Sequence, residues 1–421
     1  MPHRTRRAFL RDALAGAALA VGGAELAGQE EAEMPEPDYP AAVPVTKGPK
    51  FHYFGYYDKT VWDASGRYVL ANEVSFMDRQ PNADDVLTVG LVDLQAGNQF
   101  RPLAETRAWN WQQGTMLQWV ESAPERLIVH NHREEDRFVA IVRDIETGQS
   151  RTLPRPVCAL SRDGRYAVSL NYARIHQARP GYGYLGLPDP WQDQGAPDDD
   201  GIYWMDMATG EDRLIISHAQ VAAIGHEEGM EDTKHWFNHL VWSPDGSRFA
   251  FLHRWRPHGR RGWKTRLFTA NPDGSDIYCL ADHDMVSHYD WCGSDKVLAW
   301  ARQRGIGDRY FLFTDRTDQV EVVGEGVLTT DGHCSYSPDG RWILTDTYPD
   351  REHRRTLILF RPADGRRVDL GRFYSPPELG GPIRCDLHPR WNRDGTQVCI
   401  DSAHEGERQM YVLDVSGIVH G

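Results

Sequence analysis

The chain has little of what a disulfide-stabilised, membrane-spanning or helical protein would show. Its 421 residues include only six cysteines, and no two of them form a Cys-x-x-Cys pair, so the sequence implies no disulfide framework. After the N-terminal region no run approaches the roughly 20 consecutive apolar residues that a membrane-spanning helix requires. Helix-period patterns are nearly absent there too. We therefore expect neither a membrane span nor a helical fold.

Several catalytic signatures are missing as well. The chain has no Gly-Lys-Ser/Thr phosphate loop, no His-Glu-x-x-His zinc motif and no Gly-x-Ser-x-Gly elbow. The formal net charge is −14 at pH 7, and such an excess of acidic groups repels polyanions. These absences argue against nucleic acid and against an anionic membrane as partners.

Aromatic residues and short alternating segments are what the sequence does contain. There are 14 Trp and 17 Tyr. Segments such as Arg-Phe-Ala-Phe-Leu-His, from residue 248, and Arg-Trp-Ile-Leu-Thr-Asp, from residue 341, have the period typical of strands. The predicted fold class is all-β.

One phrase recurs four times in the second half of the chain. Each copy has a histidine three residues before an aromatic residue, and a turn follows at once. The copies read His239-Leu-Val-Trp-Ser-Pro-Asp-Gly, His288-Tyr-Asp-Trp-Cys-Gly-Ser-Asp, His333-Cys-Ser-Tyr-Ser-Pro-Asp-Gly and His388-Pro-Arg-Trp-Asn-Arg-Asp-Gly. Proline presets φ in such a turn and Asp-Gly supplies a positive φ. A period of about 45 to 55 residues indicates a repeat architecture.

Three further first strands bring the number of repeats to seven. They are Lys59 to Trp62, Met116 to Val120 and Val157 to Leu160. The last repeat lacks its fourth strand, and residues 43–53 could supply it, which would close a ring without exposed edges. We predict a seven-bladed β-propeller over residues 43–421, closed by an N-terminal strand that completes the last blade, and we expect a monomer.

The N-terminus resembles a twin-arginine export signal. It reads Thr5-Arg6-Arg7-Ala8-Phe9-Leu10-Arg11 and continues into a weakly apolar stretch rich in Gly and Ala. We assign residues 1–28 to this signal peptide and the acidic, Pro-rich residues 29–42 to a linker. The pattern predicts a periplasmic or secreted protein, with the twin-arginine export machinery as a partner that carries it already folded.

The four repeated histidines are candidate metal ligands. His239, His288, His333 and His388 would start consecutive inner strands at one face of the ring, where imidazoles could converge on one divalent ion such as Mn or Zn. Alternatively, each histidine only bonds the neighbouring blade. The equivalent residues of the first three repeats are Lys59, Met116 and Val157, so the fold itself does not require histidine. His235 is a weaker candidate.

The longest loop, residues 172–200, is the candidate substrate-binding element. Its arginines, tyrosines and Trp191 suit a charged sugar, because guanidinium groups bind carboxylate or sulfate and aromatic faces stack on pyranose rings. The run His253-Arg254-Trp255-Arg256 falls on the same face. The alternative is a loop folded over the outside of its blade. Predicted substrate-binding residues are Trp191, Arg254, Trp255, Arg256 and His235.

Over roughly residues 50–416 the chain resembles the seven-bladed propeller polysaccharide lyases of the oligogalacturonate lyase and ulvan lyase type. Its Ser-Pro-Asp-Gly repeats are also similar to those of the Tol-system periplasmic propeller, which binds partners without catalysis. The oligogalacturonate lyase resemblance implies a manganese ion held by histidines of adjacent blades and a glutamine, with His333 and His388 at histidine positions. Cys385 and Arg390 stand where that family would show the glutamine and another histidine.

The ulvan lyase resemblance implies a His and a Tyr as base and acid, with an Arg that neutralises the uronate. By order along the chain, the counterparts are His132 as base, Tyr184 or Tyr182 as acid, and Arg174 or Arg179. β-Elimination needs such a set, because the C5 proton of a uronate is too weakly acidic until an Arg or a divalent cation offsets the carboxylate. A base then takes the proton and a phenol protonates the leaving oxygen.

Three functions remain open from the sequence. The first is an exported lyase that acts on acidic poly- or oligosaccharides. The second is a non-catalytic propeller that binds a protein or glycan. The third is a glycosidase, which would need two carboxylates flanking the bond; Glu134-Glu135-Asp136 and the group Glu228, Glu231 and Asp232 are the available acids.

Overall fold

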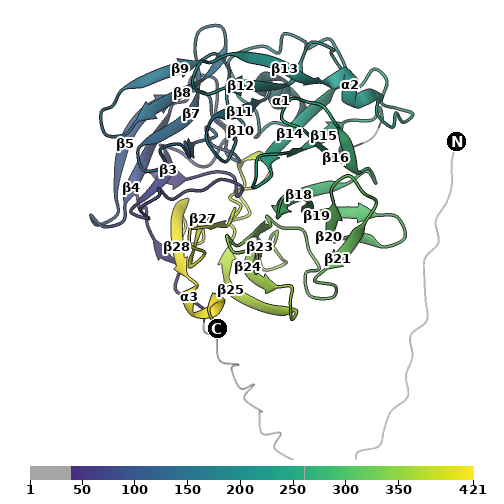
Figure 1. The fold of residues 1–421 in the computed structure, drawn as a ribbon. Helices are drawn as coiled ribbons and strands as arrows, with labels where there is room; N and C mark the ends of the chain where they lie inside the picture. Colours follow the sequence, from purple (N-terminus) through teal and green to yellow (C-terminus); the bar gives the residue numbers. More distant parts are fainter. Residues whose placement is uncertain (1–38, 260) are drawn as a thin grey trace, which may run out of the picture. The chain divides into compact units, whose positions relative to one another are not determined.

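The computed structural model describes residues 39–421 except residue 260. The predicted signal peptide and residues 29–38 of the predicted linker lie outside the described residues. The described part contains seven four-stranded antiparallel sheets, arranged as blades around a common axis (Figure 1). The prediction of an all-β, seven-bladed propeller is confirmed.

In chain order and from the axis outward, the first three blades are β2 (Phe51–Tyr53), β3 (Tyr68–Val74), β4 (Leu87–Asp93) and β5 (Gln99–Thr106); β6 (Gln118–Trp119), β7 (Leu127–Arg133), β8 (Phe138–Asp144) and β9 (Ser150–Leu153); and β10 (Ala159–Leu160), β11 (Tyr166–Ser169), β12 (Gly201–Asp206) and β13 (Asp212–Ser217). Blades 4 and 5 are β14 (His235–Trp242), β15 (Phe249–Trp255), β16 (Lys264–Ala270) and β17 (Tyr278–Ala281); and β18 (Val286–Cys292), β19 (Lys296–Gln303), β20 (Gly307–Thr314) and β21 (Val320–Val323).

Blades 6 and 7 are β22 (Ser335–Tyr336), β23 (Ile343–Asp346), β24 (Arg354–Arg361) and β25 (Arg366–Tyr374); and β26 (Arg390–Trp391), β27 (Gln397–Ser402), β28 (Gln409–Asp414) and β1 (Val43–Pro44). The helices are α1 (Tyr172–Ala178), α2 (His218–Ala223), α3 (Ser416–Val419) and the 3₁₀ turn η1 (Gly381–Ile383). None of the described helices is long and apolar enough to cross a bilayer.

The Ser-Pro-Asp-Gly motif forms the turn between the first two strands of a blade. In blade 4 the Ser243 hydroxyl accepts a hydrogen bond from N of Arg248 (3.0 Å), and Gly246 has a φ of +71°, which only glycine adopts at no cost. Ser337 makes the same bond to N of Trp342 in blade 6 (3.0 Å). The motif therefore fixes the register between the first and second strands of these blades.

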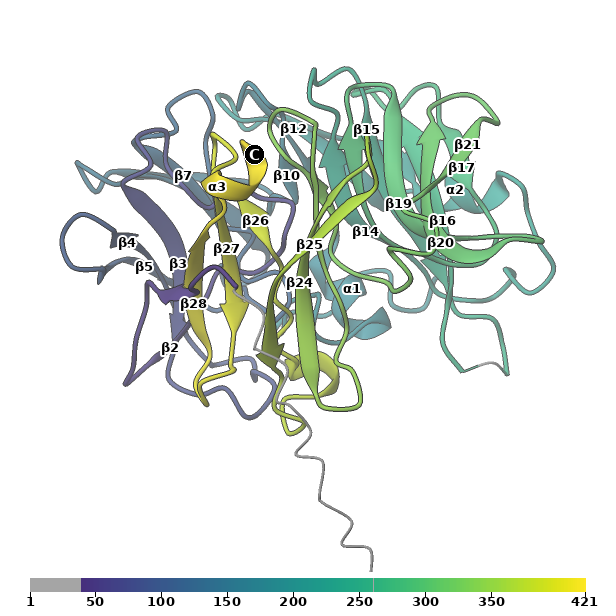
Figure 2. The ribbon, with the colours of Figure 1, turned by 90° about the horizontal axis from the view of Figure 1, so that it is seen from below.

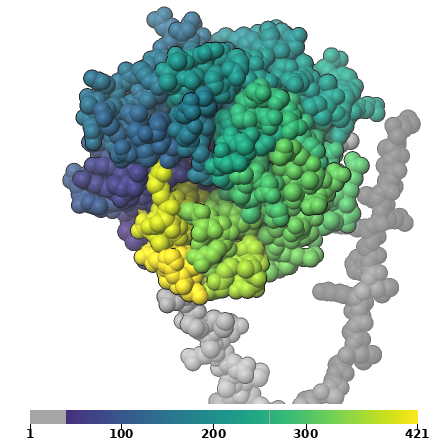
Figure 3. Space-filling view, viewed as in Figure 1, coloured from purple at the N-terminus to yellow at the C-terminus, as the bar shows by residue number. Residues whose placement is uncertain are grey.

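The last blade contains strands from both ends of the described chain. Val43 of β1 pairs with Val412 of β28, and N of Val45 donates to O of Met410 (2.9 Å). The closing strand is shorter than the predicted range 43–53, because Phe51–Tyr53 forms β2 and pairs with β3 of blade 1. In the space-filling view, the purple and yellow ends of the described chain lie next to each other (Figure 3).

The two faces of the ring carry different features. The turns between first and second strands lie on one face, which we call the turn face. The inner strands begin on the opposite face, which we call the histidine face. Figure 2 shows α3 and the C-terminus on one side of the ring and α1 on the other. The insertion that contains α1 therefore belongs to the histidine face.

A chain that begins at residue 47 should form a less stable propeller than a chain that begins at residue 39. The shorter chain lacks β1 and the bond from N of Met410 to the Thr46 hydroxyl (2.9 Å). Each lost bond costs about 0.5–1.5 kcal/mol, and β28 becomes an exposed edge. We expect a lower Tm and increased light scattering on heating. Equal melting and scattering of the two chains would show that β1 does not close the ring.

Candidate functional site

A segment that leaves blade 1 fills the centre of the ring. Residues 54–60 lie between β2 and the bridge that joins Trp62 to Val69, and we call them the axial segment. Asp401 of β27 accepts hydrogen bonds from N of Phe54 (3.1 Å) and N of Gly55 (3.2 Å). Gly55 has a φ of +124°, and a Cβ there would lie 2.8 Å from the backbone of Gln113. Glycine is therefore needed for the chain to turn toward the axis.

Two tyrosines of the axial segment lie among the predicted histidines. The ring centroid of Tyr56 is 4.7 Å from that of His239 and 5.1 Å from that of His388. The ring of Tyr57 is 5.3 Å from the rings of His239 and His333. Burial raises the pKa of both phenols well above their usual value. One short segment thus contacts histidines from blades 4, 6 and 7.

Two of the histidines have a strained backbone conformation, which sets the direction of their side chains. His239 has a φ of +52° and His388 a φ of +41°, a region that non-glycine residues rarely occupy. The pairing of β14 shifts register between Asn238 and Leu240, so His239 is the extra residue of a β-bulge. Met116, the equivalent residue of blade 2, also has a φ of +52°. The backbone feature therefore occurs at three of the seven equivalent positions, and it does not depend on the imidazole, since Met116 has it and His288 and His333 do not.

His333, His388 and Asp386 form a group whose facing atoms all lie within 4.8 Å of one another. Nε2 of His333 and Nε2 of His388 are 3.9 Å and 3.8 Å from Oδ2 of Asp386, which is too far for hydrogen bonds. Both Nε2 atoms are buried and have no partner among the described residues. Buried polar atoms are normally satisfied, so the space between these three atoms suits a divalent ion.

Carboxylates behind the histidines fix their orientation. Nδ1 of His333 lies 2.9 Å from Oδ1 of Asp346, and Nδ1 of His288 lies 2.9 Å from Oδ1 of Asp331. A carboxylate on one ring nitrogen leaves the other free to bind a metal. Burial lowers the pKa of His288 and holds that of His388 well below its usual range, so both rings are neutral at pH 7.

The structure brings three of the four predicted metal ligands together. The ring of His333 is 4.1 Å from that of His288 and 4.4 Å from that of His388. His239 lies apart from them, on the other side of Tyr56 and Tyr57, and its Nε2 is 3.5 Å from Oδ2 of Asp58. Burial lowers the pKa of His239 to about 4. His288 flanks the His333, His388 and Asp386 group, and His239 is separate from it.

Asp386 is fully buried and yet ionised. Burial alone would raise the pKa of this carboxyl, but Arg384 and Arg355 hold it well below its usual range. Their guanidinium nitrogens lie 2.5 Å and 2.7 Å from its oxygens. A carboxylate has about four lone-pair sites, so two arginines leave room for a further contact. The sequence interpretation missed Asp386, although its position two residues before His388 was the available signal.

Tyr182 joins the insertion to this group. Its hydroxyl accepts a hydrogen bond from Nη2 of Arg384 (2.7 Å), and the guanidinium of Arg179 lies 3.7 Å from the centroid of its ring. Burial would raise the pKa of Tyr182, but Arg179 and Arg384 outweigh it and lower that pKa. Tyr348, which is 37% exposed, lies at the outer edge of the group with its ring 6.1 Å from that of His333.

The insertion crosses the histidine face and does not lie over the outside of its blade. A Cβ on Gly181 would lie 3.0 Å from Pro382 of η1, so a loop of blade 3 meets the connection that leads into blade 7. Arg174 anchors the loop from within. Its guanidinium donates to O of His235 (2.6 Å), Asp189 (3.2 Å), O of Trp191 (3.2 Å) and O of Gln194 (3.0 Å). With its donors engaged and 1% exposed, Arg174 is placed as a structural residue.

The predicted base and acid, His132 and Tyr184, do not meet. Tyr184 is fully buried, stacks on Tyr172 with ring centroids 4.2 Å apart, and accepts a hydrogen bond from Asn131 (2.9 Å). His132 follows Asn131 in β7, so the two side chains point to opposite faces of the sheet. Burial lowers the pKa of His132, and the opposing charge of Glu134 does not outweigh it.

The other predicted substrate-binding residues divide between interior and surface. Nδ1 of His235 lies 2.8 Å from Nε2 of His253 in a buried stack that also contains Trp255, so His235 and Trp255 are interior residues. Arg254 is buried near Tyr56 and Tyr182. Arg256 is exposed and donates to O of Ala178 (3.2 Å). Trp191 is half-buried, with its carbonyl bonded to Arg174.

Cys385 and Arg390, where the sequence departs from the lyase pattern, do not belong to the group of His333, His388 and Asp386. Cys385 packs against Leu379 and Ala403, and Arg390 forms a buried ion pair with Asp401 (2.8 Å). Cys334 lies in a hydrophobic cluster beside Ile343. The functional candidates that the sequence interpretation missed lie on three segments outside the repeat phrase. They are the axial segment, the connection after β23 that carries Tyr348, and the extended stretch that leads into β26.

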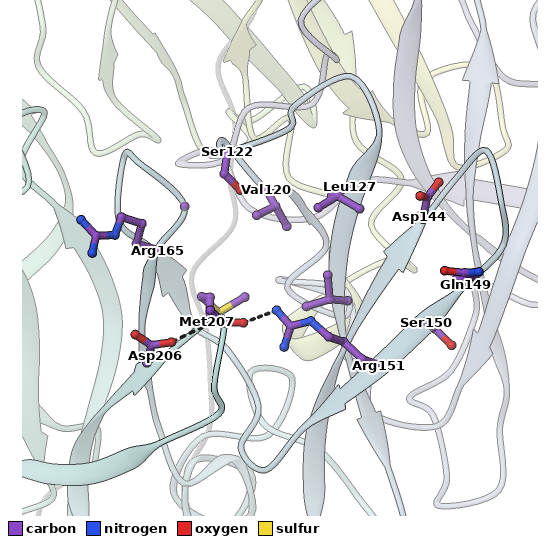
Figure 4. A pocket seen from close by; sticks show the side chains of 13 residues that line it. Val120, Ser122, Leu127, Asp144, Gln149, Ser150, Arg151, Arg165, Asp206 and Met207 are labelled. Atoms are coloured by element: carbon purple, nitrogen blue, oxygen red, sulfur yellow. Dashed lines mark hydrogen bonds between the residues drawn. The ribbon is translucent and has the colours of Figure 1, made fainter.

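A cavity of about 440 Å³ lies away from this group, between blades 2 and 3 (Figure 4). Its polar groups are already engaged within the protein. Arg151 donates to O of Met207, Asp144 is bonded to Arg126, and Asp206 accepts from N of Ala208 (2.8 Å). The cavity is lined by none of the candidate site residues and offers no group of unpartnered polar atoms among the described residues.

No family model matches the sequence, and neither does any curated protein. Among solved structures, an oligogalacturonate lyase in complex with manganese matches with a TM-score of 0.65 and 16% identity, over 89% of this chain and 93% of that one. An oligogalacturonate lyase from Vibrio parahaemolyticus matches with 0.62 and 16%, over 88% and 93%. TolB from Acinetobacter baumannii matches with 0.42 and 14%, over 84% and 79%.

The shared feature is the fold. At 16% identity the likeness to the two lyase structures establishes the seven-bladed architecture, and a fold can host unrelated activities. The TM-score with TolB is too low to argue from. The function of this chain has to be argued from its own side chains.

Arg174→Met should lower the free energy of unfolding by about 3–5 kcal/mol, because it leaves buried Asp189 without its guanidinium partner. Arg179→Met is the matched control on the same insertion, since Arg179 forms no ion pair with a described carboxylate and should change stability little. Chemical denaturation monitored by tryptophan fluorescence measures both. A fully stable Arg174→Met protein would contradict the anchoring role.

Proposed function

We propose that this protein is a lyase that cleaves uronic-acid-containing oligo- or polysaccharides by β-elimination. The observation that carries the proposal is the group on the histidine face. Two buried imidazoles with unpartnered Nε2 atoms face an ionised aspartate, next to a phenol whose pKa is lowered. On the twin-arginine pattern at Arg6-Arg7, the enzyme would work in the periplasm or outside the cell.

His333, His388 and Asp386 would hold a divalent ion, Mn²⁺ or Zn²⁺. The donor set fits, since two imidazoles and a carboxylate suit either metal, and the carboxylate of Asp346 orients His333 through its Nδ1. When bound, such an ion offsets the charge of a substrate carboxylate and so makes the C5 proton more acidic. Without an ion, the two buried Nε2 atoms would remain unsatisfied.

Tyr182 is the proposed base. The positive charges of Arg179 and Arg384 favour its phenolate, and a base with a pKa nearer the working pH is present more often in its reactive form. Tyr348 is the proposed acid, because its ring lies at the exposed edge of the same group, 6.1 Å from that of His333. Arg384 acts electrostatically on both phenols, so it can stabilise one tyrosine as phenolate while the other donates its proton to the leaving oxygen.

Substrate access requires movement of the insertion. Tyr182 is 1% exposed, and Gly181 packs on Pro382. Gly181 and Gly186 have φ values of +95° and +99°, so glycines bound the short stretch that carries Tyr182. We infer that the residues around Tyr182 move to admit the sugar, while Arg174 keeps α1 in place and Tyr184 keeps its stack on Tyr172.

A binding propeller without catalysis is the second candidate function. Arg174 anchors the insertion by donating to Asp189 and to the backbone carbonyls of His235, Trp191, Gln194 and Gly195. An insertion held in this way fits a fixed binding surface.

The two candidates are separated by incubating the purified protein with pectate, ulvan, heparin-type and alginate substrates, with and without Mn²⁺ or Zn²⁺. Elimination creates a 4,5-unsaturated uronate, and its ultraviolet absorbance should rise with at least one polyanion. His333→Ala combined with His388→Ala should lower the bound metal and the rate together. No signal from any substrate, with no metal bound, would favour the binding propeller.

Tyr182→Phe should lower kcat by about 10²–10⁴-fold, the usual contribution of a positioned acid or base, and leave KM nearly unchanged. His132→Ala is the matched comparison. It should keep near-normal turnover if Tyr182 is the base, and it should lose turnover if the sequence prediction of His132 as base is correct. Initial rates at saturating substrate decide between the two residues.

A further inference from the structure

A group of arginines lies on the blade 4 side of the histidine face and forms no ion pair with described carboxylates. Arg179 ends α1, Arg254 lies in β15, and Arg256 and Arg261 belong to the connection between β15 and β16. The chain as a whole has a net charge of −14, so a local excess of positive charge needs a reason. A cationic patch concentrates anionic ligands.

Arg254 is the most unusual member of the group. It is 4% exposed, its Nε donates to the hydroxyl of Thr265 (3.2 Å), and its Nη1 is buried without a partner. Burial, followed by the charge of Arg179, lowers the pKa of Arg254 to about 9. Burying a cation without a counter-ion is costly, so this position favours an anion that comes from outside the described chain.

A tryptophan covers the two guanidinium groups. Trp263 is 40% exposed, and its ring centroid lies 5.0 Å from the guanidinium carbon of Arg179 and 5.8 Å from that of Arg254. Trp236 supports it edge-on, with ring centroids 6.3 Å apart. A large exposed aromatic face held beside unpaired cations matches a ring that carries an acidic group, since the face takes the ring and the guanidinium takes the acid.

We propose that Trp263, Arg179 and Arg254 form a second sugar subsite, in which a pyranose ring stacks on Trp263 and its acidic group pairs with the two guanidinium groups. The subsite rests on the proposed function, because its role as a second subsite presupposes the reaction centre proposed around Tyr182. Arg179 also lies 3.7 Å from the ring of Tyr182, so the subsite adjoins the proposed reaction centre. The substrate would then be an oligosaccharide with acidic groups on at least two of its sugars.

The acidic group can be a carboxylate or a sulfate, because a guanidinium binds both in the same way. Calorimetric titration in the presence of EDTA separates them, since it measures binding without turnover. The probes are trigalacturonate, a galactose trisaccharide that carries sulfate esters and no carboxylate, an unmodified galactose trisaccharide and a hexaglutamate peptide. We expect one or both acidic sugars to bind and the neutral sugar and the peptide to bind at least tenfold more weakly.

The variants are Trp263→Ala and Arg254→Met. Each should raise the Kd of the acidic sugar about tenfold or more, a loss typical of a central aromatic or arginine contact. Trp204→Ala is the matched control, because Trp204 is half-buried and is also stacked by an arginine, with Arg213 at 4.1 Å, but belongs to β12 in blade 3. Its Kd should equal that of the wild type.

The outcomes separate this subsite from the lyase proposal. If the wild type binds an acidic sugar through Trp263 and Arg254 but never cleaves it, the subsite stands and the lyase proposal falls. If hexaglutamate binds as well as the sugars, the patch recognises charge alone and the sugar subsite is overturned. Unchanged Kd values in both variants, or no binding of either acidic sugar by the wild type, would overturn it too.

Thermal melting of Arg254→Met without ligand gives a second readout. If the role of Arg254 is to bind an anionic ligand, removing its buried and uncompensated charge should leave Tm unchanged or raise it. If Arg254 is only structural, Tm should fall and the Kd should change only in proportion to the unfolded fraction. Arg174→Met, in which all the lost contacts are internal, shows the size of a purely structural loss.

Discussion

The buried ion pair between Arg390 and Asp401 is the interaction on which the centre of the molecule depends. Arg390 donates to Asp401 (2.8 Å) and to O of Gly55 (3.1 Å), and Asp401 accepts from N of Phe54 and N of Gly55. A buried pair of this kind is stable only when its remaining hydrogen bonds are satisfied, and here the axial segment satisfies them. Blade 7 thereby fixes where a segment of blade 1 enters the ring.

The position of the axial segment sets the environment of the histidines. Tyr56 and Tyr57 occupy the space where four imidazoles could otherwise have met. His239 is left with Asp58 on one side of the two tyrosines, and His333 and His388 face Asp386 on the other. The ring of four equivalent histidines that the repeat suggests is thus divided into two chemically different halves.

The fold could be predicted from the sequence because it is specified locally and repeatedly. The Ser243 hydroxyl makes the same turn bond as the hydroxyls of Ser161 and Ser337, so three blades carry the same local information. The convergence of His333 and His388 followed from the same period. To predict the positions of His333 and His388, it was enough to assume that equivalent residues of a closed ring point toward its axis.

The rest of the site could not be predicted because it lies on segments that interrupt the repeat. Tyr56 belongs to an excursion with no counterpart in other blades, and Asp386 precedes the phrase that marks blade 7. The role of Arg174 depended on contacts more than fifteen residues away, such as the bond to O of His235. An arginine that binds substrate and an arginine that anchors a loop have the same local sequence signature. Only the positions of their acceptors distinguish them.

Charge is distributed unevenly between these two kinds of arginine. Arg174, Arg355 and Arg384 are matched by internal acceptors, whereas Arg179 and Arg254 are not paired with described carboxylates. In our proposal, the unmatched cations beside an exposed tryptophan would make the histidine face of this acidic protein selective for anions, and the buried imidazoles next to them would hold a metal. The two features together favour an acidic glycan over a neutral one.

The central claim is that His333, His388 and Asp386 hold a divalent ion on the histidine face. Anomalous X-ray scattering at the manganese edge, from crystals grown with Mn²⁺, tests it most directly. We predict one strong anomalous peak bounded by Nε2 of His333, Nε2 of His388 and a carboxylate oxygen of Asp386. Density without a peak there, with Arg384 and Arg355 still engaging both oxygens of Asp386, would contradict the account.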